Sequence, residues 1–487
     1  MSKLLFVGGD FSGIQKFIYN ISSKKASVSL KGRSAYLSEE LKRICDELIK
    51  LPALQKANPR VIYCSGGKFY VITNNSQEIT ESIDTYRDRV ERAIWEEHYG
   101  QLGIAIDYLP FDFVSSQEDG VIIEGEIGNI GLLWSKMAAK FNIRKAQKFR
   151  GMISQESFFE VRYIGGNIPV CAITGIEGEN CVSIGNDVDG DVIKVLPSVK
   201  KQIERGEELR KSEGNKSFEE YAQTDNGRRT YLGILRMDID NLGIRFGQKG
   251  FANLRAYTEF SKRLTDFFDT KNPNSGLMDL RNSGDFKGHL MITYAGGDDL
   301  FVVGRWDKVI DFAETVHNKF EQYIGKDGEG LHLSGGVAIV SPKFPIAKAA
   351  EMAGEAEDAA KQYPKWNVVP NKNAFTLLGE TVGWDNEFTM VRDLKNDLYE
   401  HICKWKLSHG VLHQLMRYAE MANEENNMSY IWHSAYYFSR LVERSPEDCK
   451  DFIKKLRDNE LTRGKRHMQL VALAARWAEL ELRDLNN

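Results

Sequence analysis

The feature that most constrains the fold of this chain is an internal repeat of a strand that ends in aspartate and a hairpin that turns at a glycine pair. The first copy contains Asp10 and Gly66-Gly67, and the second contains Asp238 and Gly296-Gly297. The aspartate precedes the hairpin by 56 residues in the first copy and by 58 in the second. Segments with helical periodicity fill each interval and follow each hairpin, so both copies are predicted as β-α-β-β-α-β units. A repeat of this length indicates duplication and predicts two ferredoxin-like palm domains.

The rest of the chain completes an α+β architecture. We predict a first palm over residues 1–140, a small intervening α/β region with a linker over 141–229, a second palm over 230–383 and a helical bundle over 384–487. In the intervening region, short strands are predicted at 158–164 and 169–173. The charged stretch 199–229 is typical of a linker, and the Ser/Lys-rich stretch 22–34 of a loop. The aromatic residues at helical spacing in 428–444 are predicted to face the core of the bundle.

Composition excludes several classes of protein. The chain has 487 residues, 28% of them charged, and a mean hydropathy of −0.41. No apolar run reaches the ~18 residues that cross a bilayer, and the N-terminus does not resemble a signal peptide, so we expect a cytoplasmic protein without membrane contact. Six scattered cysteines fit reduced thiols. The net charge of −4 provides no overall attraction for nucleic acid, so RNA contacts must come from local patches or partner subunits.

The hairpin of the second palm carries acids where metal chemistry is expected. Residues 289–304 read HLMITYAGGDDLFVVG, with apolar strands on both sides of Gly296, Gly297, Asp298 and Asp299. The glycines allow positive φ and the close approach of a ligand to the backbone, which makes them candidate nucleotide contacts. Adjacent carboxylates repel one another unless a cation lies between them. An Asp-rich turn without function is the plainer interpretation of the same residues.

The topology of the unit brings two further acids to this hairpin. The end of the first strand lies beside the hairpin tip, so Asp238 and Asp240 are predicted to approach Asp298 and Asp299. Converging carboxylates suit Mg²⁺ or Mn²⁺, and two such ions can support an in-line phosphoryl transfer. We therefore predict Asp238, Asp298 and Asp299 as catalytic metal ligands. Asp240 is a weaker candidate ligand, with the capping of backbone amides as its alternative role.

The corresponding hairpin of the first palm has a different charge. Its tip reads Gly66-Gly67-Lys68. An ammonium group donates hydrogen bonds and cannot bind a cation, whereas it can bind a phosphate. The first palm is therefore predicted to lack the metal pair and to hold a nucleotide through these residues. Its alternative role is that of a structural partner alone.

Five stretches of the chain carry a resemblance to a known family and follow one another in that family's order. They are GGDFSGIQKFIYNISSKKASVSLKGRSAYL (8–37), SGGKFY (65–70), RMDIDNLG (236–243), AGGDDLF (295–301) and SGGVAIVSPKFPIAKAAEMAGEAEDAAK (334–361). In them the chain resembles the large polymerase subunit of type III CRISPR effector complexes, most like the Csm (type III-A) branch. The resemblance implies two palms that face each other, each with one ATP, and conversion of ATP into cyclic oligoadenylates when target RNA pairs with guide RNA. It also implies that the partners are the other subunits of such a complex, with the RNAs contacted mostly through them.

The same resemblance extends to single residues. The second palm is also similar to diguanylate cyclase domains, in which a lysine of the last helix binds triphosphate; by position this is Lys361, with Lys365 as the second choice and a plain surface lysine as the alternative. No His-Asp dipeptide occurs in the chain, so the nuclease activity of an HD domain is not expected. Many members have a four-cysteine zinc site, whereas here Cys171 and Cys181 stand alone, which makes zinc doubtful.

Two other functional classes remain compatible with the sequence. The chain could be a stand-alone cyclic nucleotide synthase, or an enzyme that couples ATP to another small molecule such as S-adenosylmethionine. Alternatively it could be a non-catalytic scaffold that binds guide and target RNA and partner subunits. Metal-dependent release of pyrophosphate from ATP separates the enzymes from the scaffold.

Overall fold

The computed structural model describes most of the chain. The residues described are 4–22, 24–115, 121–123, 130–154, 168–186, 190–211, 216–247, 254–297, 299–325, 331–364, 372–424, 428–461 and 463–486. Asp298 and Lys365, two of the predicted site residues, lie outside them.

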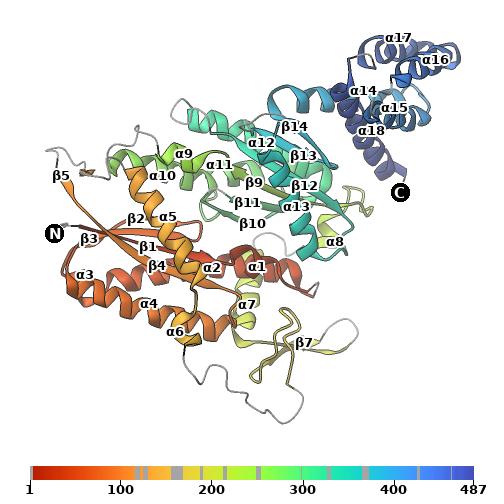
Figure 1. Cartoon of the computed structure of the whole chain (residues 1–487). Helices are drawn as coiled ribbons and strands as arrows, with labels where there is room; N and C mark the ends of the chain where they lie inside the picture. The colour runs from red at the N-terminus through yellow and green to blue at the C-terminus, as the bar shows by residue number, and fades with distance from the viewer. Residues whose placement is uncertain are drawn as a thin grey trace.

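The first palm has the predicted strand order. Its antiparallel sheet runs β2-β3-β1-β4, from β1 (Leu4–Ser12), β2 (Arg60–Ser65), β3 (Lys68–Asn74) and β4 (Gly103–Phe111). Alternation divides the apolar side chains of β1 between two cores. Leu5 and Val7 belong to the core that includes α2 (Ala26–Ile49) and α4 (Gln77–His98), while Phe6 belongs to the core shared with α5 (Ile130–Ala146) and the second palm. Figure 1 shows α2 and α4 below this sheet.

The second palm repeats this arrangement and extends it. Its sheet runs β10-β11-β9-β12-β13-β14, and the first four strands occupy the same relative positions as β2-β3-β1-β4. The strands are β9 (Leu232–Ile239), β10 (Leu290–Gly296), β11 (Asp299–Arg305), β12 (Leu333–Val340), β13 (Ala374–Leu377) and β14 (Glu380–Gly383). The helices are α10 (Leu254–Phe268), α12 (Trp306–Ile324) and α13 (Ile346–Lys361). The two ferredoxin-like palms are thus confirmed, while the edge strands β13 and β14 were not predicted.

Two predictions about irregular segments are wrong. The predicted loop at 22–34 contains the first part of α2, and the predicted linker contains a helix, α7 (Pro197–Lys211). These helices pack closely: a Cβ placed on Gly32 would lie 1.7 Å from the Gln202 carbonyl oxygen, and one on Gly206 would lie 2.1 Å from that of Val28. The small residues that suggested a loop therefore form a close helix–helix contact.

The intervening region holds little regular structure among its described residues. Its strands are β7 (Val182–Asn186) and β8 (Val192–Val195), whereas the strand predicted at 169–173 is reduced to a single bridge between Val170 and Glu177. The strand predicted at 158–164 lies outside the described residues. The boundary predicted after residue 140 falls inside α5. Short elements complete the chain: α1 (Ile14–Tyr19), α3 (Pro52–Gln55), β5 (Phe113–Ser115), β6 (Val121–Ile123), α6 (Arg150–Ile153), α8 (Phe218–Tyr221), α9 (Leu242–Gly247) and α11 (Gly276–Asn282).

The C-terminal region is helical, as predicted, and forms a lobe at one end of the molecule (Figure 1). Its helices are α14 (Thr389–Cys403), α15 (Gly410–Asn423), α16 (Ser429–Arg444), α17 (Glu447–Lys455) and α18 (Lys465–Asn486). The expectation that the aromatics of α16 are core is only partly met, because Tyr430 and Phe438 are buried whereas Trp432 and Tyr436 are exposed. Within the described part of the chain, no helix combines the length and apolarity needed to cross a bilayer.

Candidate active site between the palms

The structure brings two of the predicted acids together. Asp238, near the end of β9, is directly opposite Asp299, the first residue of β11. A third acid, Glu357 of α13, joins them, and carboxylate oxygens of the three lie within 4.8 Å of one another. Asp240 is not a member of this group, and Asp298 lies outside the described residues. Hard oxygen donors at this spacing fit Mg²⁺ or Mn²⁺.

Two cations neutralise most of this negative charge. The Nζ atom of Lys361 lies 2.6 Å from Asp238 Oδ2 and 2.6 Å from Glu357 Oε1, and Arg236 Nε lies 3.0 Å from Glu357 Oε2. Burial disfavours the charged form of Lys361, but the neighbouring carboxylates Asp238 and Glu357 outweigh it and raise the pKa of the amine. Lys361 is therefore a firmly charged ammonium beside the predicted metal ligands.

Sequence reasoning missed Glu357 and Arg236. A glutamate in an Ala-rich helix usually faces solvent, yet Glu357 is only 3% exposed. Its spacing of four residues from Lys361 was the available signal, since i and i+4 share one helix face. Arg236 alternates with the apolar residues of β9, a pattern that predicts only which face of the strand it is on. It does not predict the ion pair with Glu357, which is 121 positions away in the chain.

Asp240 has a different role from Asp238. It is 1% exposed, and its Oδ2 accepts hydrogen bonds from Ser334 Oγ at 2.5 Å and from the Asn373 amide at 3.0 Å. Its own amide donates to the carbonyl of His332 at 2.8 Å. Burial raises the pKa of Asp240, and the hydroxyl of Ser334 partly offsets this effect. These contacts join β9 to β12 and to the segment before β13, which supports the predicted alternative of an acid that caps backbone amides.

The first palm holds a charge-reversed copy of the site. Lys68 lies opposite Asp10 in the β1–β3 register, as Asp299 lies opposite Asp238. Asp10 is buried, and its Oδ2 lies 2.7 Å from Nζ of Lys145 on α5. The hairpins close with the pairs Ser65–Lys68 and Gly296–Asp299, so Lys68 corresponds to Asp299.

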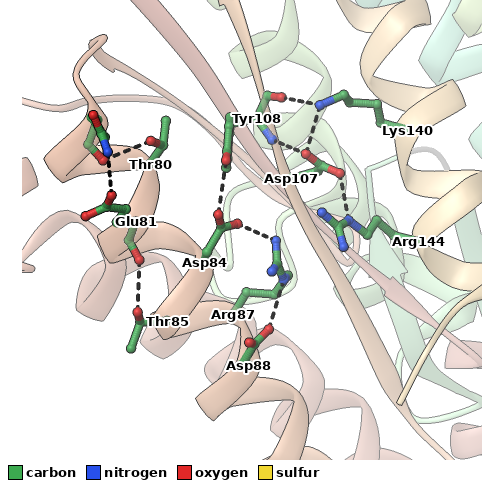
Figure 2. A network of polar contacts seen from close by, with 11 residues as sticks. Thr80, Glu81, Asp84, Thr85, Arg87, Asp88, Asp107, Tyr108, Lys140 and Arg144 are labelled. Atoms are coloured by element: carbon green, nitrogen blue, oxygen red, sulfur yellow. Dashed lines mark hydrogen bonds and ion pairs between the residues drawn. The ribbon is translucent and has the colours of Figure 1, made fainter. Parts of the chain in front are cut away.

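A polar network fixes the helix that provides Lys145. Figure 2 shows Asp107 between Lys140 and Arg144. Lys140 Nζ lies 3.0 Å from Asp107 Oδ1, and Arg144 Nε lies 2.8 Å from Asp107 Oδ2, so this β4 carboxylate pairs with two cations of α5. Burial alone would raise the pKa of Asp107, but the hydrogen bonds from Arg144, the Tyr108 amide and Lys140 lower it below its usual value. These ion pairs hold α5 against the sheet. Arg144, which makes one of them, directly precedes Lys145, so the position of Lys145 is fixed as well.

The two glycine hairpins touch each other. Gly66 and Gly297 both have positive φ, at 57° and 71°. A Cβ on Gly66 would lie 3.0 Å from Gly297 Cα and 3.2 Å from the Gly296 carbonyl oxygen. Only glycine therefore combines the required turn with this backbone contact.

Two cavities border this contact. One, of about 250 Å³, combines Tyr63 and Lys68 of the first palm with Trp134 of α5 and with Leu242 and Tyr257 of the second palm. The other, of about 200 Å³, combines the tip of the second palm with Ile14, Leu41 and Lys42 of the first palm and with Phe268 and Lys271. Both have apolar or aromatic walls and at least one lysine, a combination that suits a nucleotide base and its phosphates.

Two stretches of the chain match known protein families. Residues 3–162 match the family described as Csm1 subunit, domain B, and residues 231–370 match the second palm domain of Cas10/Cmr2. The chain thus combines two palms, the second of them similar to that of the Cas10/Cmr2 class. More particularly, it is a homologue of the Cas10/Csm1 subunits of subtype III-A CRISPR systems, which confirms the resemblance found in its motifs.

The similar curated proteins are all longer. The CRISPR system single-strand-specific deoxyribonuclease Cas10/Csm1 of Enterococcus italicus is 27% identical over 435 residues, covering 74% of this chain and 54% of that protein. Its counterpart in Mycobacterium tuberculosis is 25% identical over 502 residues, covering 87% and 58%. The chain therefore spans little more than half the length of these relatives.

Solved structures support the fold over almost the whole chain. A Csm1–Csm4 cassette in complex with pppApApA has a TM-score of 0.64 and 21% identity, covering 97% of this chain and 69% of that one. A cassette in complex with one ATP has a TM-score of 0.63 and 20% identity, covering 97% and 70%. At this identity the likeness establishes the arrangement of the palms.

Proposed function

We propose that this protein is a metal-dependent nucleotidyltransferase that converts ATP into cyclic oligoadenylates within a type III-A CRISPR effector complex. The observation that carries the proposal is the opposition of Asp238 and Asp299 in one palm, next to a twin palm with Lys68 in place of the second acid. Relatives in complex with ATP, pppApApA and cA3 support ATP as the substrate and a cyclic product.

Each part of the site has a role in this reaction. Asp238 and Asp299 would hold Mg²⁺ or Mn²⁺, with Asp298 as a further predicted ligand; such ions, when bound, stabilise the charge that develops on a transferred phosphoryl group. Lys361 offers its ammonium to the triphosphate. Its neighbours Glu357 and Arg236 fix its position through the ion pairs described above.

The two cavities explain why one chain carries two palms. A nucleotide in the cavity beside Lys68 and another beside the tip of the second palm would meet at the glycine contact. In the reaction the 3′-hydroxyl of one nucleotide loses its proton to solvent and its oxygen bonds to the α-phosphorus of the other, while the bond from that phosphorus to the β-phosphate oxygen breaks and pyrophosphate leaves. The charge-reversed palm therefore holds the nucleotide that attacks, and the acidic palm holds the triphosphate that is cleaved.

Assembly follows from the same relatives. The matched structures are of cassettes with Csm4, so a Csm4-like subunit is the proposed direct partner. Guide and target RNA would act mostly through the assembled complex, in keeping with the net charge of −4.

The decisive experiment is product analysis by mass spectrometry. The purified protein, alone and in its complex with target RNA, is incubated with ATP and Mg²⁺ or Mn²⁺. We expect pyrophosphate and cyclic oligoadenylates that depend on target RNA. The double variant Asp298→Ala/Asp299→Ala should abolish both products, while Glu207→Ala/Glu208→Ala, which removes two exposed adjacent acids of α7, should not. Equal product formation by both double variants would refute the site. RNA binding without any pyrophosphate would favour the scaffold, and an ATP adduct with a second compound would favour the conjugating enzyme.

A further inference from the structure

A second cluster of metal-compatible side chains lies in the second palm, apart from the acids at Asp238. His317 and Glu321 are one turn apart on α12, and His332 precedes β12. Glu321 Oε1 lies 3.4 Å from His317 Nε2 and 2.6 Å from His332 Nδ1. The three donor atoms are within 4.8 Å of one another, and none of the three residues belongs to the Asp238 group.

A fourth donor and its support complete the cluster. Asn373 Oδ1 lies 2.8 Å from His317 Nε2. The Nδ2 of the same amide lies 3.3 Å from both carboxylate oxygens of Asp385 and donates to them, which keeps Oδ1 directed at His317. The ring of His317 stacks on Trp384 with 4.8 Å between centroids, and the residue is 3% exposed. The donors are therefore held in place by packing and by hydrogen bonds, as in metal sites with an ordered surrounding shell.

The contacts of His317 are compatible with a metal ion on Nε2. Its Nε2 faces Asn373 Oδ1, and its Nδ1 faces Asn318 Oδ1 at 3.3 Å. A neutral imidazole has a single N–H group and donates to one of these oxygens, and the other contact then needs the amide nitrogen of the asparagine. With a metal ion on Nε2, Nδ1–H donates to Asn318 while the oxygens of Glu321 and Asn373 face the ion.

We propose that His317 Nε2, Glu321 Oε1 and His332 Nδ1 bind one divalent ion of the zinc class, with Asn373 Oδ1 or a water as the fourth ligand. Two imidazoles with a carboxylate select zinc-like ions over Mg²⁺. Donor atoms of a tetrahedral site with bonds of about 2.0–2.1 Å lie about 3.3 Å apart. The 3.4 Å separation already matches this value, whereas the 2.6 Å separation, and the 2.8 Å separation between Asn373 Oδ1 and His317 Nε2, each need a small opening.

The bound ion would join three segments that lead to the catalytic acids. It links α12, the start of β12 and the segment before β13. The backbone amide of Asn373 also donates to the carboxylate of Asp240, and the backbone amide of Asp240 donates to the carbonyl of His332. Asp240 follows Asp238 by two residues in the chain. The site is independent of the proposed nucleotidyl transfer, and its expected effect is to stabilise the second palm.

The test uses Co²⁺ as a spectroscopic probe on the metal-depleted full chain, with excess Mg²⁺ to occupy carboxylate sites. We expect one equivalent to bind, with the intense visible absorption of a four-coordinate ion and a higher melting temperature. Glu321→Gln and His332→Gln change side chains that are about one-third exposed, so both variants should fold. Each should lower Co²⁺ affinity at least about tenfold. The matched control is His467→Gln, which disrupts a His–Glu pair of the same length, 2.6 Å to Glu460, that has no second histidine in its described surroundings.

Three results would overturn the proposal. One is the absence of Co²⁺ absorption in the wild-type protein, which would assign the cluster to a proton instead. Another is equal affinity in wild type, Glu321→Gln and His332→Gln. The last is loss of the signal in Asp299→Ala, which would place the ion at the carboxylate group. Melting curves without metal verify that every variant is folded.

Discussion

The two palms share one frame and differ by the sign of one charge. In both, the first strand delivers an aspartate, and a lysine from the helix after the last strand reaches it: Lys145 to Asp10 at 2.7 Å, and Lys361 to Asp238 at 2.6 Å. The residue opposite that aspartate is Lys68 in one palm and Asp299 in the other. A carboxylate there would add a metal ligand, whereas an ammonium would repel the metal. The two copies of the unit thus differ at the one position that the proposed division into a cation-binding and an anion-binding palm requires.

The lysine-bearing helices are fixed by different means. In the first palm, Asp107 holds α5 through two ion pairs (Figure 2). In the second, α13 lies close to the sheet: a Cβ on Gly336 of β12 would lie 2.5 Å from Ala356 Cβ. Close packing leaves little freedom around Lys361, which suits a residue placed beside reacting groups, while the polar anchor of α5 is open to change by pH.

The largest expected effect comes from making the second palm resemble the first. Asp299→Lys should lower pyrophosphate release by at least about 1,000-fold, because it removes a carboxylate and places a positive charge where the ions bind. Equilibrium binding of ATP to the cavity beside Lys68 of the first palm should persist. Release above a tenth of the wild-type rate would show that the charge at this position does not distinguish the palms.

A smaller effect separates the two lysines. Lys361→Met should reduce kcat/KM for ATP by about 10–100-fold, since it removes a charge-assisted contact to the triphosphate and leaves Asp238 and Glu357 without their shared partner. Lys145→Met, the equivalent change in the first palm, should alter turnover by less than about threefold, because Lys145 pairs with Asp10, which faces Lys68 and not a second candidate metal ligand. Steady-state pyrophosphate assays measure both. Similar losses in the two variants would contradict the division of roles.

Local pattern was sufficient to predict the frame and half of the site. Apolar alternation and the glycine turns limit the strand register, which is why Asp238 could be predicted to lie near the hairpin tip from sequence, while its pairing with Asp299 comes from the structure. The ion pair of Arg236 with Glu357 joins residues far apart in the chain, and each looks like a surface charge in isolation. A glycine such as Gly32 or Gly206 is compatible both with a loop and with a close contact between helices. The sequence around it does not distinguish the two, because the packing depends on the partner helix.

The glycine contact between the palms can be tested by adding one carbon atom. Gly66→Ala meets the backbone of Gly296 and Gly297 at 3.0–3.2 Å, so the two tips must separate. Gly227→Ala is the matched control, since Gly227 has φ of 75° but nothing within 4 Å of an added Cβ. Both should lose about 1–2 kcal/mol of stability through backbone strain. Only Gly66→Ala should also lower product formation, by about tenfold. Equal activity in the two variants would mean that the tips need not touch.

The smallest effect concerns the anchor of α5 and its dependence on pH. The folded-state pKa of Asp107 is depressed, so its contribution to stability is present above the unfolded pKa of about 3.9 and is lost as the pH falls through the lower folded value. Lys140 and Arg144 are about one-third exposed, which limits this contribution to about 1 kcal/mol. Asp107→Asn should therefore melt a few degrees lower than wild type at pH 7, with a difference that shrinks toward pH 3. Lys348→Gln, which removes an exposed ion pair to Glu351, should show little change at either pH. If the difference in melting temperature between Asp107→Asn and wild type did not change with pH, the loss would come from packing, and the ion pairs of Asp107 would not stabilise α5.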